Sequence, residues 1–238
     1  MKPHIGTFLS IGSPTIAELA SLSGFDWVLI DLEHGNGSES SVADQLRALR
    51  GSRTQGIVRV GAPHPDLIAR LLDWGADGVM APHVDSPAQA EAIVHSMHYP
   101  PRGRRGYSRT VRGHQYGLRR PEDSPMPVMM AQIESIEGVR NAVEIARVEG
   151  VDVLFVGPAD LQHDLNHGSG AAVGDFTECL KRVVAAAECA GKKSGILVRD
   201  PADVGYFMGL GFTQVAIESD LSILRKSWEL ILSQLKPL

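Results

Sequence analysis

Ionisable side chains gather in one short stretch of the sequence, Asp26-Trp-Val-Leu-Ile-Asp-Leu-Glu-His-Gly35. An apolar run of strand character ends there in Asp31, Glu33 and His34. The pKa of an imidazole lies near neutrality, which suits proton transfer, and a carboxylate close by could orient it. A lone histidine is more often a hydrogen-bonded structural residue, but a position directly after a strand and beside Asp31 puts acid–base catalysis on an equal footing. This stretch therefore leaves two interpretations open, an active-site edge or a polar turn that closes a buried strand.

Two further carboxylates follow other apolar runs, Glu134 in Gln132-Ile-Glu134 and Asp160 in Gly157-Pro-Ala-Asp160. Carboxylate oxygens are ligands that Mg²⁺ and Mn²⁺ prefer, and these ions fill their other positions with water and substrate oxygens. Two such carboxylates facing one cavity would hold a divalent metal ion. Alternatively, Asp160 could be a helix N-cap and Glu134 a solvated turn residue.

A single arginine, Arg59, interrupts an apolar run in Val58-Arg-Val60. Burying a guanidinium is costly unless an anion accompanies it. A substrate carboxylate, an enolate or one of the neighbouring acidic side chains would each serve as that anion.

These residues can act together only if the fold brings them close to one another. The alternation of strands and helices along the chain predicts such a fold. Apolar, β-branched runs predict strands at 5–9, 26–31, 57–60, 78–81, 127–133, 151–156, 194–198 and 214–218. Helical periodicity predicts helices at 14–23, 40–50, 65–74, 86–97, 136–148, 175–190, 201–209 and 220–235. Strands that each precede a helix indicate a parallel sheet, and the eightfold count favours a closed (β/α)8 barrel over an open doubly wound sheet. We expect one domain over residues 1–238.

In such a barrel the active site is built at the C-terminal ends of the strands. The residues introduced above all lie at predicted strand ends, so we expect them to meet at one face. Two long loops, 99–126 and 157–174, are expected on that same face. Long loops in a compact domain are often functional.

Composition narrows the class of protein. A net charge of −5 disfavours nucleic acid as the main partner, although arginines at 102–120 leave room for one basic patch. No apolar stretch has membrane-spanning length and no secretory leader is evident, so we expect a cytoplasmic protein without a membrane partner. No lysine falls at a predicted strand end, which disfavours Schiff-base chemistry.

The motifs, in their order, resemble the metal-dependent (class II) pyruvate aldolases of the 2,4-dihydroxyhept-2-ene-1,7-dioate and 2-keto-3-deoxy sugar-acid aldolase group. The segments that carry the resemblance are Gly24-Phe-Asp-Trp27, Asp31-Leu-Glu-His34, Val58-Arg-Val60, Leu72-Asp-Trp-Gly-Ala76, Tyr99-Pro-Pro-Arg-Gly-Arg-Arg-Gly106, Gln132-Ile-Glu134 and Gly157-Pro-Ala-Asp-Leu161. They extend over most of the chain.

The resemblance implies a (β/α)8 barrel whose last helix packs on a neighbouring subunit, in a homo-trimer or homo-hexamer. It implies that Glu134 and Asp160 ligate a divalent ion, Mg²⁺ or Mn²⁺ with Co²⁺ as a further choice, which holds pyruvate by its carboxylate and keto oxygens. No organic cofactor is expected.

The resemblance also implies roles for the other residues. Arg59 would steady the enolate oxygen. His34, with Asp31 and Asp73, would help to move the proton of the aldehyde-derived hydroxyl. Residues implied near the metal or around the pyruvate pocket are Gln132, Ala159 and Leu197.

The expected function is reversible cleavage of a 4-hydroxy-2-oxo acid to pyruvate and an aldehyde through a metal-stabilised enolate. Two alternatives remain: a CoA-ester carbon–carbon lyase of malyl or citryl type on the same scaffold, and a non-catalytic binding descendant. The chain departs from the commoner members at Gln162 and over 107–120. We expect these segments to meet the aldehyde, whose identity the sequence leaves open.

Overall fold

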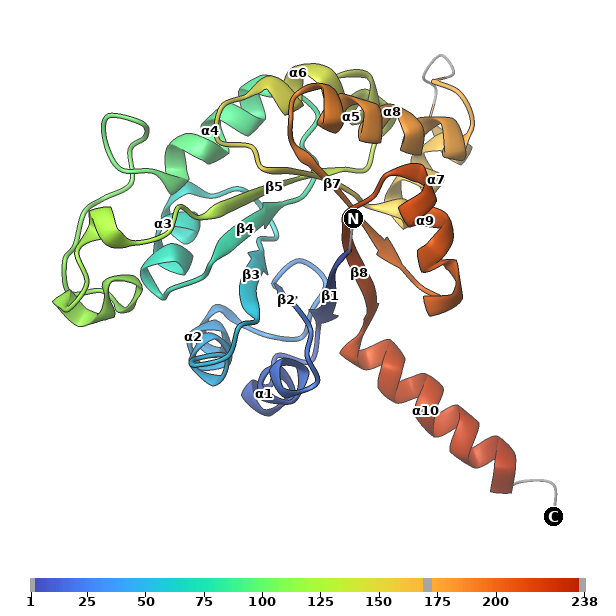
Figure 1. The fold of residues 1–238 in the computed structure, drawn as a ribbon, viewed down its shortest axis with the longest axis horizontal. Helices are drawn as coiled ribbons and strands as arrows, with labels where there is room; N and C mark the ends of the chain where they lie inside the picture. Colours follow the sequence, from blue (N-terminus) through green and yellow to red (C-terminus); the bar gives the residue numbers. More distant parts are fainter. Residues whose placement is uncertain (1–2, 169–172, 236–238) are drawn as a thin grey trace.

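The computed structural model describes residues 3–168 and 173–235. Its strands are all parallel, and each pairs with the next in sequence until the last pairs with the first, which closes a barrel (Figure 1). The strands are β1 (His4–Leu9), β2 (Trp27–Asp31), β3 (Gln55–Arg59), β4 (Gly78–Ala81), β5 (Val128–Ile133), β6 (Val153–Val156), β7 (Lys193–Val198) and β8 (Gln214–Ser219). The predicted (β/α)8 barrel is confirmed, with strand ends within two residues of those expected.

Helices alternate with the strands and surround most of the barrel. They are α1 (Pro14–Leu22), α2 (Glu39–Ala48), α3 (Pro65–Asp73), α4 (Pro87–Met97), α5 (Ile136–Arg140), α6 (Ala142–Arg147), α7 (Pro158–His167), α8 (Phe176–Cys189), α9 (Val204–Leu210) and α10 (Asp220–Leu235). Short 3-10 turns occur at Arg112–Gly117, Pro121–Asp123 and Pro201–Asp203. None of the helices in the described ranges is both long and apolar enough to cross a bilayer.

Local signals explain where several helices begin. The side chains of Ser86 and Gln89 cap the first turn of α4 reciprocally, each satisfying a backbone N–H that the helix leaves free. The Asp175 carboxylate accepts the backbone N–H of Glu178 at the start of α8. Proline occupies the first turn of α1, α3, α4 and α7, where its missing N–H costs nothing.

Alternate side chains of the strands point inward and fill the barrel interior below its C-terminal ends. A buried inner cluster contains Phe8, Trp27, Leu29, Ile57, Met80, Met130, Val153, Phe155 and Ala216. Side chains two residues further along a strand face the same side. The residues two positions after this apolar layer therefore also point into the barrel, at its C-terminal end. Several of these residues are polar, namely Asp31, Arg59, Gln132 and Glu218.

The first of the two long loops lies on the other side of the barrel from the one expected, whereas the second follows β6 on the expected side but contains a helix. Segment 98–127 joins α4 to β5, so it lies where the helices lead into the strands. That end of the barrel is opposite the C-terminal ends of the strands. The predicted loop 157–174 contains α7, and its residues 169–172 lie outside the described part of the chain. Helix α7 was missed because Leu161 alone among its residues is buried, so its sequence shows little apolar periodicity.

The predicted helix 136–148 is divided in two at Asn141. Its side-chain amide donates to the backbone carbonyl of Asp85, a contact that ties the junction to the segment after β4. The last helix, α10, points away from the barrel in Figure 1. From Arg225 to Leu235 every residue of α10 is exposed.

Candidate active site

A cavity of about 630 Å³ lies at the C-terminal ends of the strands. Its walls come from most of the barrel strands and from the helices that follow them. The lining residues are Phe8, Ser10, Asp31, His34, Arg59, Gln132, Phe155, Gly157, Pro158, Ala159, Asp160, Gln162, Phe176, Leu197, Arg199 and Ser219. Seven of the residues predicted from the sequence line this cavity: Asp31, His34, Arg59, Gln132, Ala159, Asp160 and Leu197.

Arg59 is held by two carboxylates from the neighbouring strand end. Its Nε and Nη2 donate to the two oxygens of Asp31, at 3.0 and 2.8 Å, and its Nη1 lies 2.8 Å from Oε2 of Glu33. The side chains of Arg59 and Asp31 are 6% and 2% exposed. The anion that a buried guanidinium needs is therefore supplied, at least in part, by this chain itself.

The carboxyl of Asp31 is kept ionised by these contacts. Burial, the largest single effect, would raise its pKa, but the hydrogen bond and positive charge of Arg59 act against it. The backbone N–H groups of His34 and Glu33 also donate to Asp31, at 3.2 and 3.0 Å. The balance holds the pKa of Asp31 below its ordinary value. Asp31 thus fixes both the guanidinium and the backbone that carries His34.

Glu134 is as deeply buried as Asp31, with its side chain 2% exposed. Its Oε1 accepts the backbone N–H of His83 at 2.8 Å, and Nδ1 of His83 lies 3.1 Å from the same oxygen. Its Oε2 accepts the side-chain amide of Gln132. The interpretation of Glu134 as a solvated turn residue is therefore wrong.

Burial raises the pKa of Glu134 above its ordinary value, and the negative charge of Asp160 adds to that rise against the opposing effects of His83 and Gln132. Asp160 lies in the first turn of α7, whose N-cap is Gly157, so the N-cap interpretation of Asp160 is wrong too. A cation between Glu134 and Asp160 would relieve their repulsion.

The donor set fits a divalent cation. Oε1 of Gln132 is buried and accepts no hydrogen bond from any described residue. Ligand atoms of Glu33, His83 and Glu134 all lie within 4.8 Å of one another. Oxygen-rich surroundings with an unfilled acceptor suit Mg²⁺ or Mn²⁺, and the imidazole of His83 would extend the range to Co²⁺.

Comparison with known proteins agrees with this arrangement. Residues 4–227 match the family described as HpcH/HpaI aldolase/citrate lyase. The chain belongs to this family. A relative named 5-keto-4-deoxy-D-glucarate aldolase, from Shigella dysenteriae, is 37% identical over 227 residues, which cover 94% of this chain and 89% of the relative. The protein is accordingly a carbon–carbon lyase.

Solved structures of family members share the whole fold. A HpcH/HpaI aldolase/citrate lyase family protein from Burkholderia cenocepacia has a TM-score of 0.91 at 34% identity, covering 99% of this chain and 95% of that protein. The citrate synthase SbnG has a TM-score of 0.84 at 28% identity, covering 99% of this chain and 94% of that protein. Proteins described as an aldolase/citrate lyase family member and as a citrate synthase therefore share the barrel of this chain.

Two predicted residues are absent from the lining of this cavity. Glu134 is buried against its lining residue Gln132, whereas Asp73 lies at the other end of the barrel. Asp73 is at the end of α3, on the helix-to-strand side of the barrel, where it forms an ion pair with Arg105. His34 is 67% exposed at the strand ends, and its nearest acid is Glu33 at 3.9 Å. Within one chain the structure does not bring Asp73 and His34 together.

Sequence reasoning missed several residues at the rim. Glu33, treated above as a possible turn residue, binds Arg59, and His83 binds Glu134. His83 and Glu218 both have positive φ, 52° and 57°, a conformation that costs a non-glycine residue energy. Glu218 ends a predicted strand, but no sequence pattern marks the positive φ of either residue, because this strain is a property of the folded backbone.

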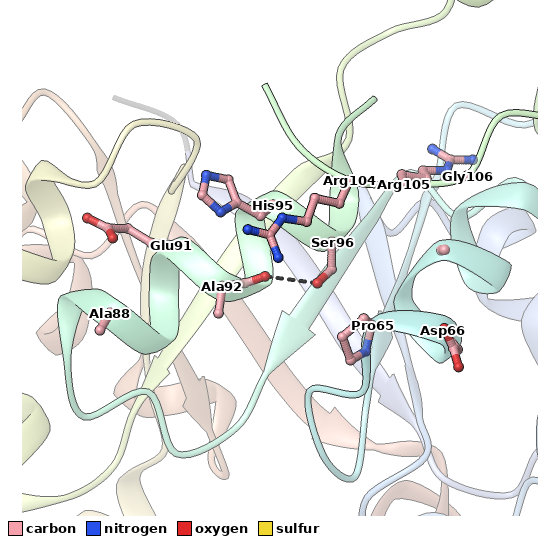
Figure 2. A pocket seen from close by; sticks show the side chains of 11 residues that line it. Pro65, Asp66, Ala88, Glu91, Ala92, His95, Ser96, Arg104, Arg105 and Gly106 are labelled. Carbon is pink, nitrogen blue, oxygen red and sulfur yellow. Dashed lines mark hydrogen bonds between the residues drawn. The ribbon is translucent and has the colours of Figure 1, made fainter. Parts of the chain in front are cut away.

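The arginine-rich segment lines other hollows. One of them is a cavity of about 430 Å³ between α3 and α4. Figure 2 shows the side chains that line it, with Arg104 and Arg105 at its border. It lies apart from the strand ends and contains none of the residues predicted for the active site. The expectation that segment 107–120 meets the aldehyde is therefore not met within a single chain.

Proposed function

We propose that the protein is a divalent-metal-dependent aldolase that reversibly cleaves a 4-hydroxy-2-oxo acid to pyruvate and an aldehyde. The observation that carries this proposal is the buried carboxylate of Glu134 at the end of β5, which lies near Asp160 in the first turn of α7, so that burial and the charge of Asp160 both raise its pKa. Relatives named 5-keto-4-deoxy-D-glucarate aldolase make a keto-deoxy sugar acid the first substrate to try.

Glu134 and Asp160 would hold the metal, which we propose to be Mg²⁺ or Mn²⁺, with Co²⁺ as a further choice. When bound, the ion supplies Lewis-acid stabilisation of the negative charge that develops on the keto oxygen of pyruvate. Gln132 holds the Glu134 carboxylate in place, since its amide donates to Oε2. Ala159 and Leu197 form the wall beside pyruvate and restrict access of water to it.

Arg59 would donate hydrogen bonds to the enolate oxygen. Its guanidinium is preoriented, because Asp31 binds it in two places and Glu33 in a third, so no reorganisation is needed as charge develops. The two acids also lower its net local charge. A rigid hydrogen-bond donor whose positive charge is partly neutralised stabilises the enolate without binding the pyruvate product so strongly that its release is slowed.

His34 would move the proton of the hydroxyl that becomes the aldehyde. Its side chain lines the cavity and is exposed, and Asp31 fixes its backbone. Asp73 could join it only from a neighbouring copy of the chain.

A homo-oligomer, a trimer or a hexamer, belongs to the same proposal. Leu221, Leu224, Trp228, Ile231 and Leu235 recur along α10 at alternating spacings of three and four, which puts them on one face. Large apolar side chains are also exposed on the helices that flank β1 and β8, namely Leu19 and Leu22 of α1 and Tyr206 of α9. One copy's α10 would cover this surface of another.

We also propose that the protein is cytoplasmic and that residues 1–238 form a single domain.

The test is proton exchange. We expect incubation with pyruvate and Mg²⁺ or Mn²⁺ in D2O to replace the methyl protons of pyruvate, followed by NMR. Glu134→Ala should abolish the exchange, because the remaining acid cannot hold the ion alone. His34→Ala should spare more of the exchange than of aldol cleavage, since His34 acts on the aldehyde side.

The matched control is Glu144→Ala, an exposed acid on the outer helix α6, which should leave both activities unchanged. Absence of exchange with every divalent ion, in folded protein, would refute the enolate mechanism. Equal loss of exchange and cleavage in His34→Ala would show that His34 is misassigned.

A carbon–carbon lyase that acts on a citryl- or malyl-type CoA ester is the second candidate. It is favoured by the family's citrate lyase members and by the likeness to citrate synthase SbnG. Turnover of such a thioester, together with failure to cleave free 4-hydroxy-2-oxo acids, would favour this candidate over the first.

A further inference from the structure

Another cavity, of about 540 Å³, lies where α2 and α3 end and the short turn Arg112–Gly117 packs against them. Its lining includes the segments that lead into β3 and β4, so it is at the end of the barrel opposite the active site. A cavity of this volume suits a small molecule. We call it the arginine cavity, because the described residues of its lining include Asp77 as the single carboxylate and five arginines, Arg47, Arg50, Arg53, Arg112 and Arg119.

Much of the positive charge in this cavity is not neutralised by acids. Asp77 accepts the backbone N–H of Gly56 at 2.8 Å, and Asp44 pairs with Arg47. Arg50 and Arg53 are exposed and form no ion pair with any acid in the described ranges. A positively charged hollow therefore remains on a chain whose net charge is −5.

The arginines lie close enough to repel one another. Burial, the largest effect, lowers the pKa of Arg112, and the positive charges of Arg47 and Arg50 lower it further against the opposing effects of Tyr116 and Asp77. A cleft lined by one sign of charge concentrates ions of the opposite sign. An anion with several charges would relieve this repulsion.

The wall of the arginine cavity is held in place by Arg112 itself. Its Nη1 donates to the backbone carbonyl of Trp74 at 2.6 Å, and its Nη2 donates to that of Leu46 at 2.9 Å. The turn is thereby tied to the ends of α3 and α2. A ligand would meet a wall that is already ordered, which lowers the entropy cost of binding.

This turn presents an aromatic ring on a strained backbone. Gln115 and Tyr116 have φ of 51° and 57°, and this left-handed conformation costs non-glycine residues energy. Such strain clusters at ligand clamps. Tyr116 lines the cavity yet is 61% exposed, so its ring contributes little to the core. Hydrogen bonds with Asp44 and then with Tyr116 raise the pKa of Arg47, which places the phenol beside the guanidinium groups.

An exposed ring beside several guanidinium groups matches the two halves of a nucleotide. Aromatic side chains stack on the faces of bases, and guanidinium groups bind phosphate oxygens in pairs. A simple inorganic anion would leave the ring of Tyr116 without a role. The enclosed volume suits one nucleotide better than an extended nucleic-acid strand.

We propose that the arginine cavity binds a nucleoside diphosphate or triphosphate, with its phosphates on Arg50, Arg53 and the neighbouring arginines and its base on Tyr116. The active site is at the other end of the barrel, so this nucleotide is not a substrate of the carbon–carbon lyase. The arginine cavity shares no lining residue with the active-site cavity, and its occupancy is independent of the proposed aldol reaction.

The test is calorimetric titration of the whole protein with ADP, pyrophosphate and adenosine at low ionic strength. EDTA in the buffer removes any metal that would hold phosphate at the strand ends. We expect ADP to bind more tightly than pyrophosphate or adenosine. Arg50→Gln/Arg53→Gln should weaken ADP and pyrophosphate roughly 10- to 100-fold, because charge-assisted contacts are lost. Tyr116→Ala should weaken ADP about fivefold or more and change pyrophosphate by less than about twofold, because only the base stacks on the ring.

Arg147→Gln/Arg182→Gln is the matched control, since it removes the same charge from exposed positions on the outer helices α6 and α8 and should leave ADP binding unchanged. Absence of ADP binding by the wild type would overturn the proposal, as would equal losses in the two double variants. Unaltered ADP affinity in Tyr116→Ala would reduce the cavity to a phosphate site and refute the nucleotide assignment. A short oligoadenylate that binds more than about tenfold tighter than ADP would assign the surface to single-stranded nucleic acid instead.

Discussion

A buried guanidinium shared by two carboxylates makes Arg59 a residue on which both stability and chemistry depend. Removing one member of a buried ion pair leaves uncompensated charge, which costs about 3–5 kcal/mol. We expect Arg59→Met to lower the free energy of unfolding by this amount near pH 7, measured by urea denaturation without metal. The side chains of Arg59, Asp31 and Glu33 are all at most 10% exposed, so water cannot fully replace the lost contacts.

The pH dependence of this loss has a definite sign. In the wild type the pKa of Asp31 lies below its ordinary value, so its stabilisation is present above that value and is lost as pH falls through the folded-state pKa. Without Arg59, burial would raise the pKa of Asp31, and its contribution would instead fade as pH rises. The difference between wild type and Arg59→Met should therefore grow from pH 4 to pH 7. A difference independent of pH would mean that Arg59 stabilises by packing alone, and Arg182→Met provides the exposed control.

At the scale of elements, strand positions and their polar ends were predictable because burial on both faces makes a parallel strand one continuous apolar run. That rule predicts Arg59, Gln132 and Asp160 at one cavity, and all three line it. It could not find Glu33 or His83, whose contacts with Arg59 and Glu134 depend on the path of the loops after β2 and β4. It also misplaced segment 99–126, because the loop follows a helix rather than a strand.

The junction between β6 and α7 determines how closely the backbone approaches the proposed metal ligands. A Cβ on Gly157 would lie 2.4 Å from Oε2 of Glu134 and 2.9 Å from Nε2 of Gln132. We expect Gly157→Ala to push the Glu134 carboxylate aside, at a cost of about 1–3 kcal/mol in stability, and to weaken Mn²⁺ binding at least about tenfold in calorimetric titration.

Gly205→Ala is the control for that substitution. It lies in α9 with no heavy atom within 4 Å of its added Cβ, so it should leave Mn²⁺ binding unchanged and raise stability by about 0.5–1 kcal/mol. Unaltered Mn²⁺ affinity in Gly157→Ala would indicate that Glu134 does not bind the ion.

At the scale of the whole molecule, the apolar face of α10 has no packing partner within the described part of a single chain. It contacts the barrel chiefly through β1 and β8, and its residue Trp228 is 62% exposed with Ile231 on the same face. Each large apolar side chain buried at an interface contributes about 1.5–3 kcal/mol, enough in combination to hold subunits together.

We expect Trp228→Glu/Ile231→Glu to reduce the mass found by size-exclusion chromatography with light scattering from that of an oligomer to the 25.6 kDa of one chain. Ser227→Glu/Ser233→Glu adds the same charge to the same helix off this stripe and should leave the oligomer intact. A wild type that already elutes as a single chain would contradict the proposed assembly. It would also remove the route by which a neighbour's Asp73 could reach His34.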